Sequence, residues 1–174
     1  MFKYFKKTNT REKNLYNKIL SLSRNKLFYT KFDLLDTFQN RINLIFLHIS
    51  FIFIRIKLKE KELSYKKFYQ KMFDFIFKRI ELDMREIGYG DMVVNKNMKF
   101  LVKSFYNILL NCENYQYKNL SNKNHFLLRY LRLNSNIKTT KNIGLVEYFD
   151  KYQIFCLDLG SDKVLKGELN FEYK

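Results

Sequence analysis

Histidine and cysteine are the side chains here that could act as bases, nucleophiles or metal ligands, and the chain has two of each. His48 and His125 are far apart, and neither has a cysteine or a second histidine at the spacing of a metal site. Cys112 and Cys156 lie in apolar stretches and are predicted to be buried thiols rather than a disulfide. There is no phosphate-binding glycine loop, no HExxH and no CxxC. We therefore predict a protein that is not an enzyme and that binds no metal or cofactor.

Basic and acidic residues recur at seven-residue intervals in two neighbouring stretches. Arg41, His48 and Arg55 fall on one stripe of a helix, because seven residues are close to two turns. Asp74 and Glu81 have the same spacing in the next stretch. A short connection would make the two helices antiparallel neighbours. One hypothesis is therefore that the basic stripe meets the acidic one, with His48 as a hydrogen-bonded core residue.

In the alternative hypothesis, Asp74 and Glu81 are both exposed to solvent. Asp74 would then pair with Lys78, and Glu81 with Arg85, at the four-residue spacing of neighbours on a helix. The sequence does not decide between the two arrangements.

Two of the five glycines lie together, at the end of a stretch with helical periodicity. Gly88 is expected to adopt the left-handed conformation that ends a helix, and Gly90 to let the chain reverse tightly. Asp91 is expected to accept hydrogen bonds from backbone amides two residues on. A turn of this kind needs no ligand.

The same turn could also serve as a docking surface. Tyr89 stands between the two glycines and follows the charged pair Arg85-Glu86. An aromatic ring beside charged groups suits contact with another chain. Whether the turn contacts a partner or only sets the angle between two helices is left open.

The elements that position these residues are predicted to be helices, since apolar residues recur at three- and four-residue intervals. The expected helices are residues 12–25, 36–59, 63–87, 95–111, 125–134 and 143–157. Thr10, Asp36 and Asn95 are the expected N-caps, Asp36 with the capping-box spacing to Gln39. Residues 27–35 are interpreted as a connection, and residues 113–123 as a loop or a weak extension of the preceding helix. Residues 44–56 are fewer than the roughly 20 that a membrane span needs, so they predict a buried central helix.

These elements predict an all-α fold. We expect a single-domain bundle of about six helices over residues 11–174, with an extended tail at Gly167–Phe171. Residues 1–10 are expected to form a basic, flexible N-terminus without the apolar core of a secretory signal.

The charge of the chain is strongly positive, with 33 Lys and Arg against 17 Asp and Glu, a formal charge of +16. Such a charge favours anionic partners, for example a membrane surface or RNA. A solvated lysine-rich surface without a dedicated partner explains it equally well. The abundance of Lys, Asn, Ile, Phe and Tyr is also typical of an AT-rich genome, so part of the composition carries no functional meaning.

A series of motifs spans most of the chain. Residues 84–91 read MREIGYGD, with Phe73-Asp74 before them and Val94, Lys96 and Phe105-Tyr106 after them. Upstream lie Tyr29, Asp36, Arg41, Leu47-His48 and Arg55, and the tail reads GELNF. This pattern resembles the ubiquinol–cytochrome c chaperone family, with its FD…LREMGVGD…V.K…FYGR and D…R…LH…R segments, over about residues 15–172.

The resemblance implies a helical assembly factor rather than an enzyme. Its client would be newly made cytochrome b of the ubiquinol–cytochrome c reductase, and mitochondrial members also act near the ribosome with a small partner protein. It further implies a partner-binding surface or its scaffold, which we carry over to Arg41, His48, Asp74, Arg85, Glu86, Gly88, Tyr89, Gly90, Asp91, Lys96, Phe105 and Tyr106.

Two departures from the family pattern bear on the partner. Arg79-Ile80-Glu81 stands where the family commonly has DMD, and Phe105-Tyr106-Asn107-Ile108 stands where it has FYGR. If those positions carry partner contacts, the partner or the contact differs in this chain.

The expected location is the bacterial cytoplasm, peripheral to the inner membrane, because the N-terminus is too short for a mitochondrial transit region. No DNA partner is expected. The alternative function is a basic ribosome- or RNA-binding helical module, which would bind with a steep salt dependence and without cytochrome b.

Overall fold

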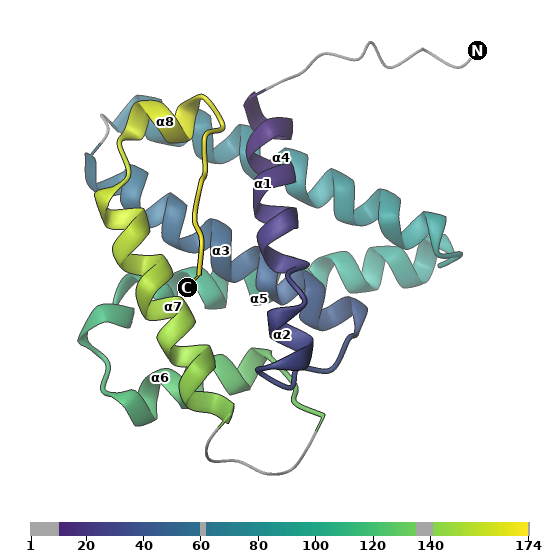
Figure 1. Cartoon of the computed structure of the whole chain (residues 1–174). Coiled ribbons are helices and arrows are strands. Elements are labelled where there is room, and N and C mark those ends of the chain that lie inside the picture. The colour runs from purple at the N-terminus through teal and green to yellow at the C-terminus, as the bar shows by residue number, and fades with distance from the viewer. Residues whose placement is uncertain (1–10, 60–61, 135–140, 174) are drawn as a thin grey trace.

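A computed structural model describes residues 11–59, 62–134 and 141–173 (Figure 1). Its elements are α1 (Arg11–Ser23), α2 (Leu27–Thr30), α3 (Phe38–Lys59), α4 (Glu62–Glu86), α5 (Asp91–Glu113), the 3-10 turn η1 (Tyr115–Tyr117), α6 (Leu120–Tyr130), α7 (Lys141–Asp158) and α8 (Ser161–Leu165). The described part contains no strand, only an isolated bridge between Leu34 and Leu133. The predicted all-α, single-domain fold is confirmed. Thr10 and the basic N-terminus, residues 1–10, lie outside the described residues.

The centre of the bundle is α3, as its all-round apolarity predicts. Residues 44–53 are all buried, among them Phe46, Leu47 and Phe53, and α3 packs against α1, α4, α5, α7 and α8. No helix in the described part of the chain is long and apolar enough to cross a membrane. The prediction of a buried central helix is confirmed.

Three helix starts differ from the sequence prediction. Thr37, not Asp36, caps α3: its Oγ1 accepts the Asn40 amide at 3.2 Å. The Asp36–Gln39 capping box is wrong because Arg41 engages the Asp36 carboxylate. Residues 27–35 also contain the short helix α2.

The other two starts lie in α5 and α6. α5 begins at Asp91 after Gly90, so the Asn95 cap is wrong. In the first turn of α5, Asp91, Met92 and Val93 are exposed and only Val94 is buried, so this turn shows no apolar stripe that would reveal a helix. α6 begins five residues before the predicted position, because the Asn119 side chain caps it by accepting the Asn122 amide at 2.8 Å.

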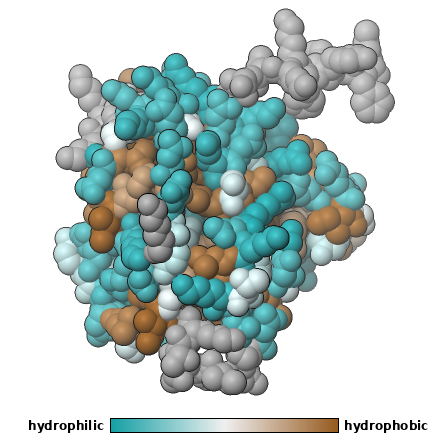
Figure 2. Space-filling view, viewed as in Figure 1, coloured by the Kyte–Doolittle hydropathy of each residue, from teal (hydrophilic) through white to brown (hydrophobic). Residues whose placement is uncertain are grey.

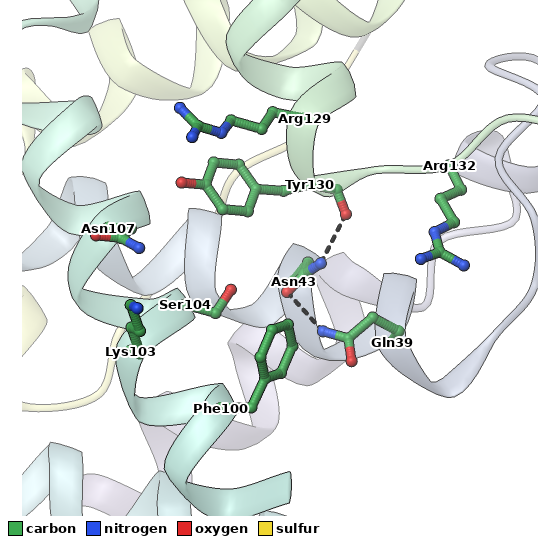
Figure 3. Close-up of a pocket in the computed structure, with 9 residues that line it drawn as sticks. All are labelled: Gln39, Asn43, Phe100, Lys103, Ser104, Asn107, Arg129, Tyr130 and Arg132. Atoms are coloured by element: carbon green, nitrogen blue, oxygen red, sulfur yellow. Dashed lines mark hydrogen bonds between the residues drawn. The ribbon is translucent and has the colours of Figure 1, made fainter.

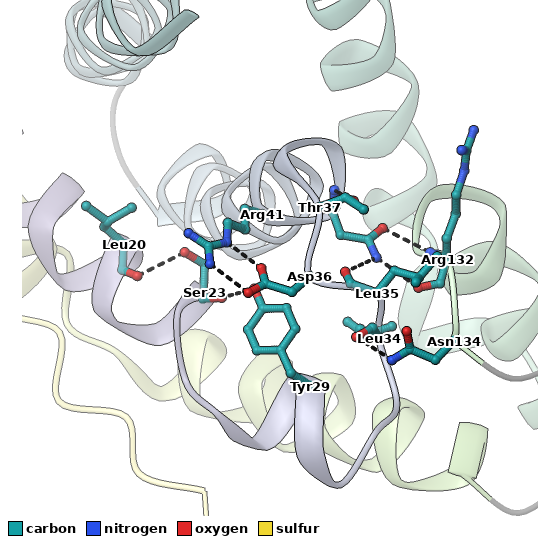
Figure 4. Close-up of polar contacts among 11 residues, drawn as sticks. Leu20, Ser23, Tyr29, Leu34, Leu35, Asp36, Thr37, Arg41, Arg132 and Asn134 are labelled. Atoms are coloured by element: carbon teal, nitrogen blue, oxygen red, sulfur yellow. Dashed lines mark hydrogen bonds and ion pairs between the residues drawn. The ribbon is translucent and has the colours of Figure 1, made fainter. Parts of the chain in front are cut away.

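A clasp of hydrogen bonds joins the segment before α3 to the segment after α6 (Figure 4). The buried side chain of Asn40 donates to the carbonyls of Leu35 and Arg132, both at 2.8 Å, and accepts the Arg132 amide at 2.9 Å. Asn134 donates to the carbonyl of Leu34. These contacts close a long loop in the chain and fix the backbone that carries Arg132.

The C-terminal tail runs back from α8 between α7 and α1 (Figure 1). Leu169 is buried, and the Phe171 ring packs on Tyr152 and Tyr148 of α7, with ring centroids 5.1 and 5.5 Å apart. Gly167 starts this run at φ +77°, where a Cβ would lie 2.9 Å from Cβ of Asn14. The predicted tail at Gly167–Phe171 therefore belongs to the fold.

Candidate functional site

The turn between α4 and α5 is a Schellman motif followed by an extended residue. The Tyr89 amide donates to the Met84 carbonyl at 3.1 Å, and the Gly88 amide donates to the Arg85 carbonyl at 3.0 Å. Gly88 has φ +100°, so its predicted left-handed role is confirmed. Gly90 has φ −70° and ψ 159°, a conformation open to any residue. The expectation that the freedom of a glycine at position 90 lets the chain reverse tightly is therefore wrong.

The two glycines therefore allow a matched test of the turn. Gly88→Ser should lower the free energy of unfolding by about 1 kcal/mol or more, because a Cβ is strained at this φ. Gly90→Ser should change it by less than about 0.5 kcal/mol, because serine is a favoured N-cap residue. Urea denaturation of the two variants measures both values. Equal effects at the two positions would contradict the assignment.

Arg85, near the end of α4, forms ion pairs on both sides of the turn. Its guanidinium contacts Glu81 at 3.0 Å, one turn earlier in α4, and the carboxylate of Asp91, the first residue of α5. These hydrogen bonds, that to Asp91 above all, raise the pKa of Arg85. Asp91 was expected to bind backbone amides, and its carboxylate pairs with Arg85 instead. These ion pairs tie the end of one helix to the start of the next.

The hairpin tip, which we define as Ile87, Tyr89, Met92 and Val93, is apolar and exposed. Met92 is 87% exposed and Ile87 60%, while Tyr89 is 41% exposed. α4 and α5 project away from the rest of the bundle, and hydrophobic surface lies at the end of this projection (Figures 1 and 2). Contiguous exposed apolar side chains of this kind mark interaction surfaces.

A groove of about 280 Å³ adjoins the tip, between α1, α3 and α4. Its apolar lining includes Ile45 and Ile80, and it reaches Ile87 of the tip. Its charged lining has both signs: Arg24, Arg41, Asp83 and Glu86. The structure thus brings two predicted site residues, Arg41 and Glu86, into one groove beside the predicted turn.

Arg41 is held in place by an ion pair (Figure 4). Its Nε and Nη2 donate to the two carboxylate oxygens of Asp36 at 2.6 and 2.8 Å. This hydrogen-bonded contact holds the pKa of Asp36 below its ordinary value. The bidentate geometry fixes the direction of the guanidinium at the groove.

The proposed contact between the basic stripe of α3 and the acids of α4 is wrong. Arg41 pairs with Asp36, and fully buried His48 binds the Leu44 carbonyl and the Tyr148 hydroxyl. Arg55 is buried, and its Nε and Nη1 have no hydrogen-bond partner among the described residues. At His48 the reason is that α3 packs on α7, which carries Tyr148, rather than on α4.

The acids of α4 stay on the surface. Glu81 pairs with Arg85, as the alternative hypothesis predicts, and Asp74 accepts a hydrogen bond from Gln70 at 2.7 Å. The Asp74–Lys78 pair stays a prediction.

The remaining predicted site residues divide between core and surface. Phe105 is buried, with its ring 5.2 Å from that of Phe46, and it belongs to the core. Lys96 is exposed on α5, and half-exposed Tyr106 lies against α4, with its ring 5.9 Å from that of Phe73. Both cysteines are buried and free, as predicted.

Sequence reasoning missed the apolar part of the tip. Met92 and Val93 carried a usable signal, because they lie off the stripe of Val94, Leu101 and Phe105 that faces the core. Apolar residues off the buried stripe of a helix are candidates for contact with another molecule.

An all-helical bundle with an exposed apolar tip and an adjoining groove defines a helical binding protein. The chain belongs to the ubiquinol-cytochrome C chaperone family, whose model matches residues 30–149. This membership confirms the resemblance seen in the sequence and supports a chaperone role in assembly of the ubiquinol–cytochrome c reductase.

A solved structure is similar over nearly the whole chain. The crystal structure of the Cbp3 homolog from Brucella abortus has 22% sequence identity and a TM-score of 0.78, and the match covers 94% of this chain and 89% of that one. At this identity the likeness shows a shared fold. No curated protein matches the chain.

Proposed function

We propose that this chain is an assembly factor that binds newly made cytochrome b during biogenesis of the ubiquinol–cytochrome c reductase. The observation that carries the proposal is the exposed apolar tip beside an apolar-lined groove, in a member of this chaperone family. The apolar faces of membrane-protein helices have no partner until the protein assembles. An apolar helix face can bind in a groove that is lined by apolar side chains.

The charges around the groove would orient the client. Arg41 and Glu86 have opposite signs in the same groove, so a bound segment with polar ends has one favoured direction. Arg41 is held by Asp36, which lowers the entropy that is lost on binding. Arg85, Gly88 and Asp91 act in this proposal as the scaffold, and Tyr89 as a contact.

We further propose a location and two further partners for this chain. The chain acts in the bacterial cytoplasm, peripheral to the inner membrane where its client is inserted. A small partner protein and the ribosome are further partners in this proposal. The chain works without catalysis and without a cofactor.

A ribosome- or RNA-binding module is the second candidate, favoured by a different observation. Between Glu113 and Glu147 the sequence contains no acidic residue, while it contains several lysines and arginines. RNA binding through this region should weaken steeply with salt and should not require cytochrome b.

Deletion of the gene tests the proposed function. The deletion strain should lose most haem-loaded cytochrome b and most assembled reductase, and a copy of the parent gene should restore both. Absorption spectra of reduced membranes measure the first, and native gel electrophoresis measures the second. Normal levels of both in the deletion strain would refute the proposal.

A further inference from the structure

A basic cavity of about 360 Å³ lies between α3, α5 and α6, apart from the hairpin tip and its groove (Figure 3). It is lined by Lys103 of α5, by Arg129 in the last turn of α6 and by Arg132 just after that helix. None of the described residues that line the cavity is an aspartate or a glutamate. Three cations without a lining carboxylate define an anion-binding environment.

Buried amides hold the backbone that presents two of these cations. Asn43 is buried in α3, and its Nδ2 donates to the Tyr130 carbonyl at 2.6 Å. Fully buried Asn40 binds both the amide and the carbonyl of Arg132. The positions of residues 129–132 are therefore set before any ligand arrives, and this lowers the entropy lost on binding.

Neutral hydrogen-bonding groups complete the lining. The side chains of Ser104, Asn107 and Tyr130 line the same cavity and lie between Arg129 and Lys103 (Figure 3). Arginine binds phosphate oxygens through two parallel hydrogen bonds, and lysine adds a point charge. This set of donors matches the several oxygens of a phosphate group.

The outer face of α5 favours a lipid phosphate over a free one. Phe100 lines the cavity and is 60% exposed, and Leu110 is exposed on the same helix. Lys96, Lys99 and Lys103 are exposed at three- and four-residue spacing, which places them on one side of the helix. The described helix α5 has its two acids only at its ends, Asp91 and Glu113. Exposed apolar and basic side chains on one helix are typical of an interfacial helix on an anionic membrane.

We propose that this cavity binds the phosphate headgroup of an anionic phospholipid, with the outer face of α5 against the bilayer surface. The inference deepens the peripheral membrane contact of the proposed function and rests on it. The cavity supplies the headgroup site, Phe100 and Leu110 reach the acyl boundary, and the hairpin tip lies at the start of the same helix.

Vesicle flotation of the purified chain tests the proposal. The parent should float with vesicles of phosphatidylcholine and phosphatidylglycerol and stay unbound with phosphatidylcholine alone. The double variant Lys103→Gln/Arg129→Gln should bind the anionic vesicles about 30-fold more weakly, the effect of two basic residues at an anionic surface. Lys103→Arg should keep the parent affinity. The control Lys67→Gln/Lys71→Gln removes the same charge from exposed sites on α4 and should lose less than about threefold.

Several results would overturn the proposal. The parent could bind vesicles without a preference for the anionic lipid. The cavity variant and the control variant could lose equal affinity for anionic vesicles. The cavity variant could also lose binding to an RNA oligonucleotide while it keeps its binding to vesicles. Soluble glycerol phosphate separates the two phosphate sources: displacement at low concentration would point to a free phosphate ligand. Because the vesicles contain no cytochrome b, failure here is distinguishable from failure of the proposed function.

Discussion

Met92→Asp is expected to reduce the recovery of newly made cytochrome b with the affinity-tagged chain by about tenfold or more, because it places an unpaired charge in an apolar interface. The fold should be unaffected. Met92 is 87% exposed, and an acidic residue in the first turn of α5 is favourable to the helix dipole. The free energy of unfolding should therefore change by less than about 0.5 kcal/mol.

Leu63→Asp is the matched control for this change. Leu63 is also the second residue of a long helix, and it is 80% exposed, but it lies at the far end of α4 from the tip. This variant should recover cytochrome b as the parent does. Equal recovery by both variants would show that the tip is not the contact. Equal loss would show a general effect of added negative charge.

Acidification from pH 6.5 to 4 is expected to remove about 3 kcal/mol of stability through His48 alone. The ring is fully buried, and burial lowers its pKa from the ordinary 6.5 to about 4. The neutral ring donates from Nδ1 to the Leu44 carbonyl at 2.6 Å and accepts the Tyr148 hydroxyl at Nε2, 2.8 Å away. Between these pH values the unfolded chain binds a proton that the folded chain does not, so stability falls as the pH falls.

His48→Gln isolates this contribution from that of the carboxylates. The variant should be less stable than the parent at pH 7, and the difference between the two should shrink by about 3 kcal/mol by pH 4. Urea denaturation across this pH range measures the difference. His125→Gln, at an exposed position in α6, should reproduce the parent profile. A constant difference between parent and His48→Gln would contradict a buried neutral histidine.

Local patterns predicted most of the helices and part of the turn. The all-round apolarity of residues 44–53 indicated the central helix, and helical periodicity before Gly88 indicated both the end of α4 and the left-handed residue. These features depend on neighbours in sequence, which a single sequence displays.

Features that depend on distant partners could not be predicted in this way. The face of α3 that carries His48 packs on Tyr148 of α7, and a seven-residue spacing does not show which helix a stripe meets. Asn40 binds the backbone of Arg132, which is 92 residues later in the sequence. This contact fixes one wall of the basic cavity. The position of Arg41 beside Glu86 likewise results from the packing of α3 against α4.

Affinity purification of the tagged parent chain after brief labelling of new proteins is the most direct test of the central claim. The expected result is newly made cytochrome b in the purified fraction, decreasing during a chase as the reductase assembles. Cytochrome b at the level of an untagged control, in cells that are actively making the reductase, would contradict the claim.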